Sequence, residues 1–373
     1  MCKILKSELL DVVIKSELSN NMLEIYAGET ALKTIQENGF SPDLFTSFLG
    51  ASGGPKWFTL FGLDKYIFGE FFKNRAQTLN VIGSSAGAFR AACFTQSDPV
   101  AAVKRLAKDY SETVYSDKAK PAEITLKGRK LLDVIFGDSG IEEIINNDIF
   151  KAHFLVAKTN GLVSYENKVL QGLGLLQSMV SNGISRPLLR SQYERFIFQP
   201  QDSQLKVHDP DNIPTQIVAL SHENIKDALL ASGAIPMVMQ GITNITDCPK
   251  GMYRDGGIID YHFDFEIKNE GLTLYPHFSS VLKAGWFDKN LSRKVRLQNY
   301  DKTVLICPSA KFVEALPHKK IPDRTDFTTM TPAERLVYWQ QVFIDSEQLA
   351  NEFAQFYQTQ NIKSIKNISH LLA

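Results

Sequence analysis

The sequence predicts an α/β fold in which a central, mostly parallel sheet is sandwiched by helices. Two strand–turn–helix units carry this prediction. One runs from the apolar, β-leaning stretch 44–49 through a Ser-Gly-Gly turn into an apolar helical stretch at 58–72. The other runs from the apolar run 79–82 through a glycine-flanked serine turn into a helix that starts at Ala86. Consecutive units of this kind are typical of parallel βαβ connections.

The composition narrows the classes of function. The chain has 373 residues, of which 44% are hydrophobic, and this is enough for a large core in one or two domains. The 41 basic residues equal the 41 acidic ones, so we expect no nucleic-acid partner. The histidines and the four cysteines show no metal-ligand spacing, so neither a metal nor another cofactor is expected. The cysteines suggest no disulfide framework, which favours a reducing, cytoplasmic location.

Three regions are predicted along the chain. Residues 1–40 form an N-terminal helical segment, residues 41–310 the α/β domain, and residues 311–373 a helical extension. Charges interrupt every apolar run in Met1–Asn21, so neither a signal peptide nor a transmembrane span is predicted there. Helical spacing of its leucines and valines favours a peripheral helix packed on the body, with an interfacial anchor as the alternative.

The other elements follow from periodicity and from residues that end helices. A helix around 31–35 stops at an Asn-Gly pair, as expected of a C-cap. The stretch 160–212 is polar and irregular with one helix around 169–180, so we expect a cap over the site. Further helices are predicted at 101–115, 131–147, 225–232 and 332–357, and further strands at 154–157, 215–220 and 304–307.

Gly83-Ser84-Ser85-Ala86-Gly87 has the Gly-x-Ser-x-Gly pattern of a nucleophile elbow. In such an elbow the serine occupies a strained turn, and small neighbours let the strand and helix backbones close around it. The hydroxyl of Ser85 would project over the strand ends, where the helix N-terminus favours developing negative charge. A structural Gly/Ser turn is the alternative for the pentapeptide alone.

The stretch Gly50–Trp57 is the second feature with chemical meaning, because it also joins a strand to a helix. Its Gly53 and Gly54 can direct backbone N–H groups at one point, as an oxyanion hole requires. Lys56 adds a positive charge close by. The residue order matches neither a P-loop nor a dinucleotide-binding turn, so a phosphate-binding loop is the weaker alternative.

Asp255-Gly256-Gly257 is the third feature. An aspartate before two glycines is by itself typical of a plain turn. Just upstream, Ala231–Pro236 ends a helix with small residues and a proline. An unperturbed aspartate is a poor base at neutral pH, so a catalytic Asp255 should sit in a partly desolvated pocket that raises its pKa.

These three elements, in this order, resemble those of the patatin-like phospholipase family. In that family a Gly-Gly-x-Arg/Lys turn makes the oxyanion hole, a Gly-x-Ser-x-Gly elbow carries the nucleophile, and Asp-Gly-Gly or Asp-Gly-Ala carries the base. The matching residues here are Gly53-Gly54-Pro55-Lys56, Ser85, and Asp255-Gly256-Gly257. The Ala-Ser-Gly-Ala-Ile-Pro stretch also resembles the family's segment before the aspartate. The resemblance extends over roughly 45–263.

The resemblance implies a patatin-like three-layer architecture and a lipid acyl hydrolase of the phospholipase A or lysophospholipase type. It implies a Ser85–Asp255 dyad that works through an acyl-enzyme. Backbone N–H groups of Gly53, Gly54 and Ala86 would surround the oxyanion. The expected substrate is a fatty-acyl ester of a lipid.

Two alternatives stay open on the sequence. Ser85, Asp255 and either His262 or His277 have the order of an α/β-hydrolase triad. A catalytically silent module that binds lipid or protein on the same fold is the second alternative, and the presence of both Ser85 and Asp255 argues against it.

The segment 283–296 mixes aromatic and basic residues. Rings at headgroup depth and cations facing anionic lipid suit a membrane interface. An ordinary surface segment with a buried tryptophan is the plainer interpretation. A peripheral membrane contact is therefore a hypothesis for this protein.

Overall fold

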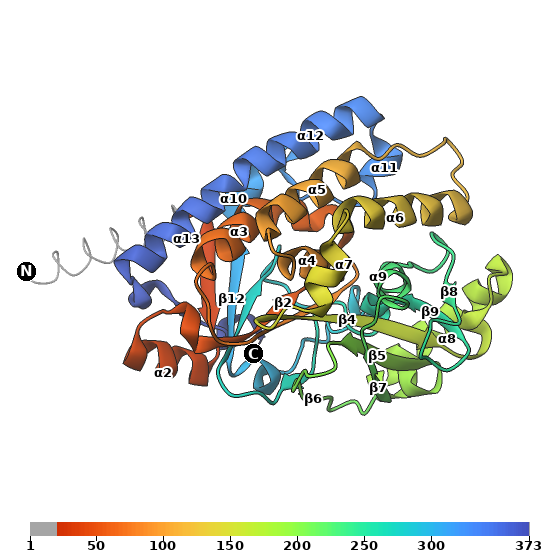
Figure 1. The fold of residues 1–373 in the computed structure, drawn as a ribbon, viewed down its shortest axis with the longest axis horizontal. Helices are drawn as coiled ribbons and strands as arrows, with labels where there is room; N and C mark the ends of the chain where they lie inside the picture. The colour runs from red at the N-terminus through yellow and green to blue at the C-terminus, as the bar shows by residue number, and fades with distance from the viewer. Residues whose placement is uncertain (1–20, 373) are drawn as a thin grey trace, which may run out of the picture.

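The structure is a computed structural model in which residues 21–372 are described. A mixed eleven-stranded sheet forms the centre of this part of the chain (Figure 1). The sheet order is β13-β1-β12-β11-β2-β3-β4-β5-β7, and β9 joins β4 to β8. These strands are β1 (Leu23–Ala27), β2 (Phe45–Gly50), β3 (Leu79–Ser84), β4 (Phe150–Thr159), β5 (Tyr193–Gln199), β7 (Thr215–Ala219), β8 (Ile242–Thr243), β9 (Met252–Asp255), β11 (Leu272–Pro276), β12 (Thr303–Pro308) and β13 (Lys366–Asn367). Two short strands, β6 (Val207–His208) and β10 (Glu266–Ile267), pair with each other.

The middle of the sheet is parallel. Strands β12, β11, β2, β3 and β4 are joined in that order by parallel ladders. Phe48, Val81 and Phe154 on these strands are fully buried, which explains why the strands appear in the sequence as short apolar runs. The predicted α/β class with a mostly parallel central sheet is confirmed.

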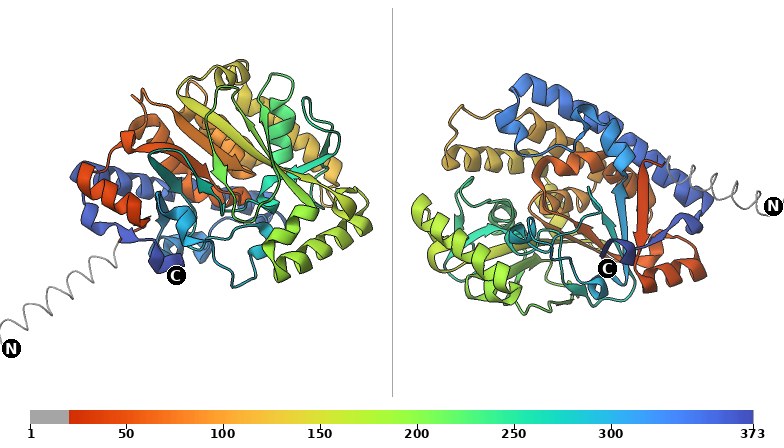
Figure 2. Two further views of the ribbon diagram at one scale, coloured as in Figure 1. Left: turned by 90° about the horizontal axis from the view of Figure 1, so that it is seen from below. Right: turned by 180° about the vertical axis from the view of Figure 1, so that it is seen from behind.

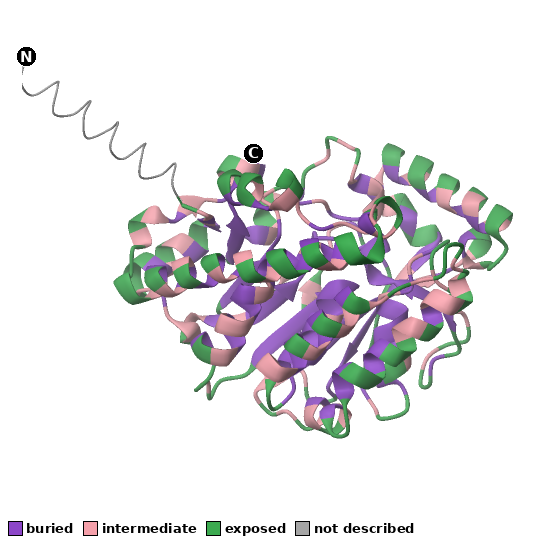
Figure 3. Cartoon of the chain, turned by 90° about the horizontal axis from the view of Figure 1, so that it is seen from above, coloured by how far each residue is buried: buried purple, intermediate pink, exposed green. Residues whose placement is uncertain are grey.

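Helices flank the sheet, and Figure 3 shows the strands buried and the outer helices exposed on one side. α4 packs on β3 and β4, and α3, α5, α12 and α13 form a layer over it (Figures 1 and 2). The helices are α2 (Glu29–Asn38), α3 (Phe61–Tyr66), α4 (Ala86–Phe94), α5 (Pro99–Glu112), α6 (Pro121–Phe136), α7 (Gly140–Ile145), α8 (Lys168–Ile184), α9 (Ile225–Ser232), α10 (Ala310–Ala315), α11 (Asp326–Thr329), α12 (Pro332–Asp345), α13 (Glu347–Thr359) and α14 (Ser369–Leu372).

Two predicted helices are interrupted. The stretch 131–147 belongs to α6 and α7, which are separated at Gly137, where φ is +53°. A glycine with positive φ commonly ends a helix. The amphipathic pattern of 131–147 is therefore shared by two helices that are separated at Gly137. The stretch 332–357 is likewise divided, at Ser346, into α12 and α13.

The stretch 160–212 differs from its prediction, because it contributes strand β5 to the sheet between β4 and β7. The strand was missed because Arg195 breaks its apolar pattern. The guanidinium of Arg195 is buried and paired with Asp260 at 2.6 Å and with Asp209 at 2.9 Å. No residue of 160–212 lines either cavity beside Ser85, so the predicted cap is not what surrounds the site.

Both ends of the described chain enter the same sheet. The segment 21–40 holds β1 as well as α2, so it is not purely helical as predicted. β1 pairs with β12 and with β13 from the C-terminal segment. The helix predicted over Met1–Asn21 lies, apart from Asn21, outside the described residues. Within 21–372, no helix has both the length and the apolar character that crossing a bilayer requires.

Candidate active site

Ser85 occupies a sharp turn between β3 and α4. Its φ of 54° and ψ of −126° are strained for a residue with a side chain. The flanking glycines are required by close packing. A Cβ atom on Gly83 would lie 2.2 Å from the carbonyl oxygen of Gly87, and one on Gly87 would lie 1.8 Å from that of Gly50. The local geometry is that of a nucleophile elbow.

The hydroxyl of Ser85 faces Asp255, which ends strand β9. Ser85 Oγ donates a hydrogen bond to Asp255 Oδ2 at 2.8 Å. The N–H of Ser85 donates to Ser232 Oγ at 3.0 Å, and Ser232 Oγ donates to the carbonyl of Leu155 at 2.7 Å. Ser232 thus ties the elbow to β4 and α9. The sequence indicated it only as part of the small-residue stretch before the aspartate.

Asp255 is held in place and desolvated. Its N–H donates to the carbonyl of Ala234 at 3.1 Å, and its Oδ1 accepts the N–H of Gly257 at 2.7 Å. Burial raises the pKa of Asp255 to about 6, although the hydrogen bonds from Ser85 and Gly257 and the charge of Arg324 act to lower it. This is the environment expected of a carboxylate that accepts a proton near neutral pH.

The glycine turn lies beside the hydroxyl of Ser85. Gly54 has φ +58° and lines both cavities that Ser85 lines. The N–H groups of Gly53, Gly54 and Ala86 have no hydrogen-bond acceptor among residues 21–372. Free N–H groups next to a nucleophile are what an oxyanion hole needs.

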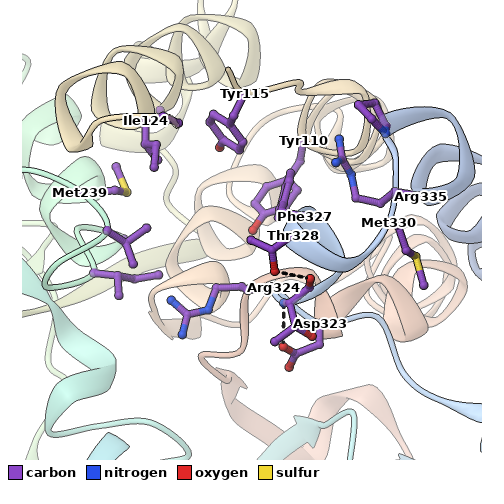
Figure 4. Close-up of a pocket in the computed structure, with 18 of the residues that line it drawn as sticks. Tyr110, Tyr115, Ile124, Met239, Asp323, Arg324, Phe327, Thr328, Met330 and Arg335 are labelled. Carbon is purple, nitrogen blue, oxygen red and sulfur yellow. Dashed lines mark hydrogen bonds between the residues drawn. The ribbon is translucent and has the colours of Figure 1, made fainter. Parts of the chain in front are cut away.

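A large cavity of about 1100 Å³ opens at Ser85 (Figure 4). Its volume slightly exceeds the range of about 300–1,000 Å³ that is usual for small-molecule sites. Most of its wall is apolar or aromatic, and includes Phe89, Leu106, Tyr110, Ile124, Leu131 and Met239. A second, smaller cavity meets the first at Ser85 and also contacts Asp255, Tyr261 and Trp286.

Comparison with known families agrees with this geometry. The sequence model of the family described as patatin-like phospholipase matches residues 72–262, just over half of the chain. The chain belongs to the patatin-like phospholipase family. The matched range contains Ser85, Ser232 and Asp255, whereas the glycine turn lies before it. A search of curated proteins returned no match.

The ammonium group of Lys56 is paired with Asp323 in this patatin-like protein. Its Nζ is 3.5 Å from Asp323 Oδ2 and 5.5 Å from the centre of the Phe278 ring. Lys56 lines neither cavity beside Ser85. Arg324 brings a further positive charge to the glycine turn and, unlike Lys56, lines both cavities.

Arg324 is a residue that the sequence did not indicate. It lies just before α11, outside the range matched to the patatin-like family, and lines both cavities at Ser85. A Cβ atom on Gly54 would be 3.1 Å from Arg324 Cγ, so the side chain crosses the turn. Its guanidinium has no hydrogen-bond or ion-pair partner within the described chain, and Figure 4 shows it extended into the cavity. Arg324 belongs to no motif, so the sequence gives no signal that its side chain lies at these cavities.

The two histidines of the alternative triad are engaged elsewhere. His262 Nδ1 accepts the N–H of Lys283 at 3.0 Å, and His277 Nδ1 accepts the N–H of Ser279 at 3.0 Å. Burial lowers the pKa of His277 to about 3 and that of His262 well below its ordinary value. In the part of the chain that the structure describes, neither ring forms a hydrogen bond with Ser85 or Asp255.

Proposed function

We propose that this protein is a lipid acyl hydrolase of the phospholipase A or lysophospholipase type that works through a Ser85–Asp255 dyad. The observation that carries the proposal is the 2.8 Å hydrogen bond from Ser85 Oγ to Asp255 Oδ2 at a strained elbow. Family membership supports the reaction class. The large cavity that opens at Ser85 has a mostly apolar wall, which supports a long acyl group as the part of the substrate that is bound.

In the acylation step, Ser85 Oγ attacks the carbonyl carbon of the ester while its proton passes to Asp255 Oδ2. The carbonyl oxygen becomes an oxyanion that the N–H groups of Gly53, Gly54 and Ala86 stabilise. The intermediate collapses, the bond to the alcohol oxygen breaks, and the alcohol leaves with the proton from Asp255. The acyl group is then bonded to Ser85.

In the deacylation step, a water molecule replaces the alcohol. Asp255 takes a proton from the water, whose oxygen attacks the acyl carbon. The bond to Ser85 Oγ breaks, Asp255 returns the proton to Ser85, and the fatty acid is released. In each step Asp255 first accepts a proton and then donates it. A pKa near neutral pH favours both transfers, because neither the protonated nor the ionised form is then strongly disfavoured.

Covalent labelling tests the proposal against the silent binding module. A fluorophosphonate should label the purified protein at Ser85, and the protein should hydrolyse a short-chain aryl ester. A folded protein whose Ser85 takes no label would favour the binding module instead.

The glycine turn gives a prediction about turnover. Gly54→Val should lower kcat on an aryl ester by about a hundredfold, or about 3 kcal/mol, because a β-branched residue at φ +58° moves the N–H donor. Lys56→Ala should have a smaller effect, since its side chain points to Asp323. Gly137→Val is a matched control with φ +53° and open space around it. A fully active Gly54→Val protein with an inactive Lys56→Ala protein would contradict the assignment.

The charge of Arg324 gives a prediction about pH dependence. Asp255 must be ionised to accept a proton, so kcat/KM should rise as the pH rises through its pKa of about 6. Arg324 lowers that pKa, so Arg324→Ala should move the rise to higher pH, whereas Arg324→Lys should keep it near the wild-type position. The measurement is kcat/KM for a neutral ester against pH. If kcat/KM of folded Arg324→Ala protein rises at the same pH as that of wild type, the charge of Arg324 does not affect the pKa of Asp255.

A further inference from the structure

Helix α8 buries its polar side and exposes its apolar side. Its buried residues are polar or small: Gln171, Gly174, Ser178 and Asn182. Its outward side carries large apolar side chains that recur every three or four residues. These are Val169, Leu173, Leu176, Met179, Val180 and Ile184, with exposed fractions of 70%, 51%, 50%, 53%, 55% and 74%. A surface helix of a soluble protein normally shows the opposite arrangement.

The buried side holds this orientation through hydrogen bonds. Ser178 Oγ is 2.7 Å from the hydroxyl of Tyr193. Asn182 Nδ2 donates to Asp288 Oδ1 at 2.9 Å. Gly174 lies so close to the preceding loop that a Cβ atom there would be 2.4 Å from the backbone nitrogen of Val163. Rotating α8 to bury its apolar side would break these contacts, so that side stays outward.

The outward side is also free of charge. Residues 169–185 contain no Asp, Glu, Lys or Arg. Lys168, directly before this stretch, and Arg190, five residues after it, are exposed, whereas Arg186 between them is buried and paired with Asp211 and Asp288. Glu166, the acidic residue before the helix, is paired with Arg254 at 2.7 Å. Apolar side chains in the middle with cations at the edges match the depth profile of a lipid surface.

The buried side of α8 is joined to a loop that forms part of the wall of the large cavity. Gln171 Oε1 accepts the N–H of Met237 at 2.7 Å, which joins α8 to the loop after α9. Met237 and Val238 in that loop are exposed, and Val238 lines the cavity that opens at Ser85. Figures 1 and 2 show α8 and the N-terminal end of α6, another wall of the cavity, at the same end of the molecule.

We propose that the outward side of α8 docks on the surface of a lipid bilayer or micelle and brings the cavity at Ser85 to that surface. The choice of lipid as the occupant rests on the proposed function, because substrate molecules with long acyl chains are present in such surfaces. α8 lies on the surface and does not cross it, since its 17 residues with polar residues on one side cannot span a bilayer.

Vesicle binding tests this docking. The full chain is sedimented with vesicles of ether-linked phosphatidylcholine, which has no carboxylic ester for the proposed hydrolase to cleave. The Leu173→Gln/Leu176→Gln protein should bind about tenfold more weakly than wild type, because two apolar side chains no longer enter the lipid. Both proteins should hydrolyse a soluble aryl ester equally, since α8 lines neither cavity at Ser85.

A matched control removes apolar side chains from another exposed helix. Val337 and Ile344 on α12 are 69% and 64% exposed, and Val337→Gln/Ile344→Gln should bind vesicles like wild type. Equal binding by the α8 variant and wild type would overturn the proposal. A second result would also overturn it: wild-type protein that binds no vesicles but forms a dimer in lipid-free buffer, where the α8 substitutions dissociate the dimer. The partner of α8 would then be a second copy of this chain. Vesicle binding without any ester hydrolysis would refute the proposed function and leave the docking intact.

Discussion

Ser85→Ala should abolish ester hydrolysis while the protein stays folded. Loss of the attacking oxygen removes the acyl-enzyme route, so kcat should fall on the order of 10⁵-fold, or about 7 kcal/mol in activation free energy. The fold should persist because the substitution removes one oxygen atom and changes no contact of the glycines around the elbow. Turnover of a short-chain aryl ester and fluorophosphonate labelling measure the loss, and thermal unfolding verifies the fold.

Ser85→Gly is the informative companion variant. Both variants lack the nucleophile, but glycine adopts φ 54° and ψ −126° without strain. Ser85→Gly should therefore raise the free energy of unfolding over that of Ser85→Ala by about 1 kcal/mol. Substantial turnover by folded Ser85→Ala protein would refute the enzymatic proposal altogether.

Asp255→Asn should be the second most damaging substitution. The amide has nearly the same shape and can still accept the N–H of Gly257, but it cannot take the proton of Ser85. We expect kcat on the aryl ester to fall by about 10⁴-fold or more. Retained activity of a folded Asp255→Asn protein would exclude Asp255 as the base.

The same substitution should stabilise the fold near neutral pH. The pKa of Asp255 is raised from 3.8 to about 6, so the folded state binds this proton more tightly than the unfolded state does. Such a group contributes stability at pH below 3.8, and that contribution is lost as the pH rises toward 6. Replacing it by an uncharged amide should therefore recover up to about 3 kcal/mol at neutral pH. Denaturant unfolding at pH 5 and above measures this gain.

Histidine variants separate the dyad from the triad. His262→Ala and His277→Ala, made singly, should each keep most of the turnover per folded molecule, because their rings bond to the backbone of Lys283 and Ser279. Both residues are buried, so a loss of stability is expected and is measured apart from kcat. A folded histidine variant as inactive as Ser85→Ala protein would establish a triad instead.

The parallel α/β core and the proposed nucleophile could be predicted from local sequence patterns, whereas the proposed base rests on the resemblance of three motifs to the patatin-like family. Strands buried on both faces need apolar side chains, and the elbow needs glycines where backbones approach, so both leave short local patterns. Ser85 lies in such a pattern, Asp255 is indicated by the family resemblance, and the structure brings them together at 2.8 Å across 170 positions of the chain.

The surroundings of Ser85 and Asp255 could not be predicted from the sequence and are known only from the folded structure. Arg324 reaches the glycine turn from a loop about 270 positions away, Ser232 supports the elbow, and β5 enters the sheet although Arg195 disrupts its pattern. The orientation of α8 likewise depends on partners such as Tyr193 and Asp288. These features come from contacts between distant segments. A local sequence pattern indicates which backbone conformation its own residues adopt. The burial, the pKa and the exposed surface of a side chain depend instead on which distant segments pack against it.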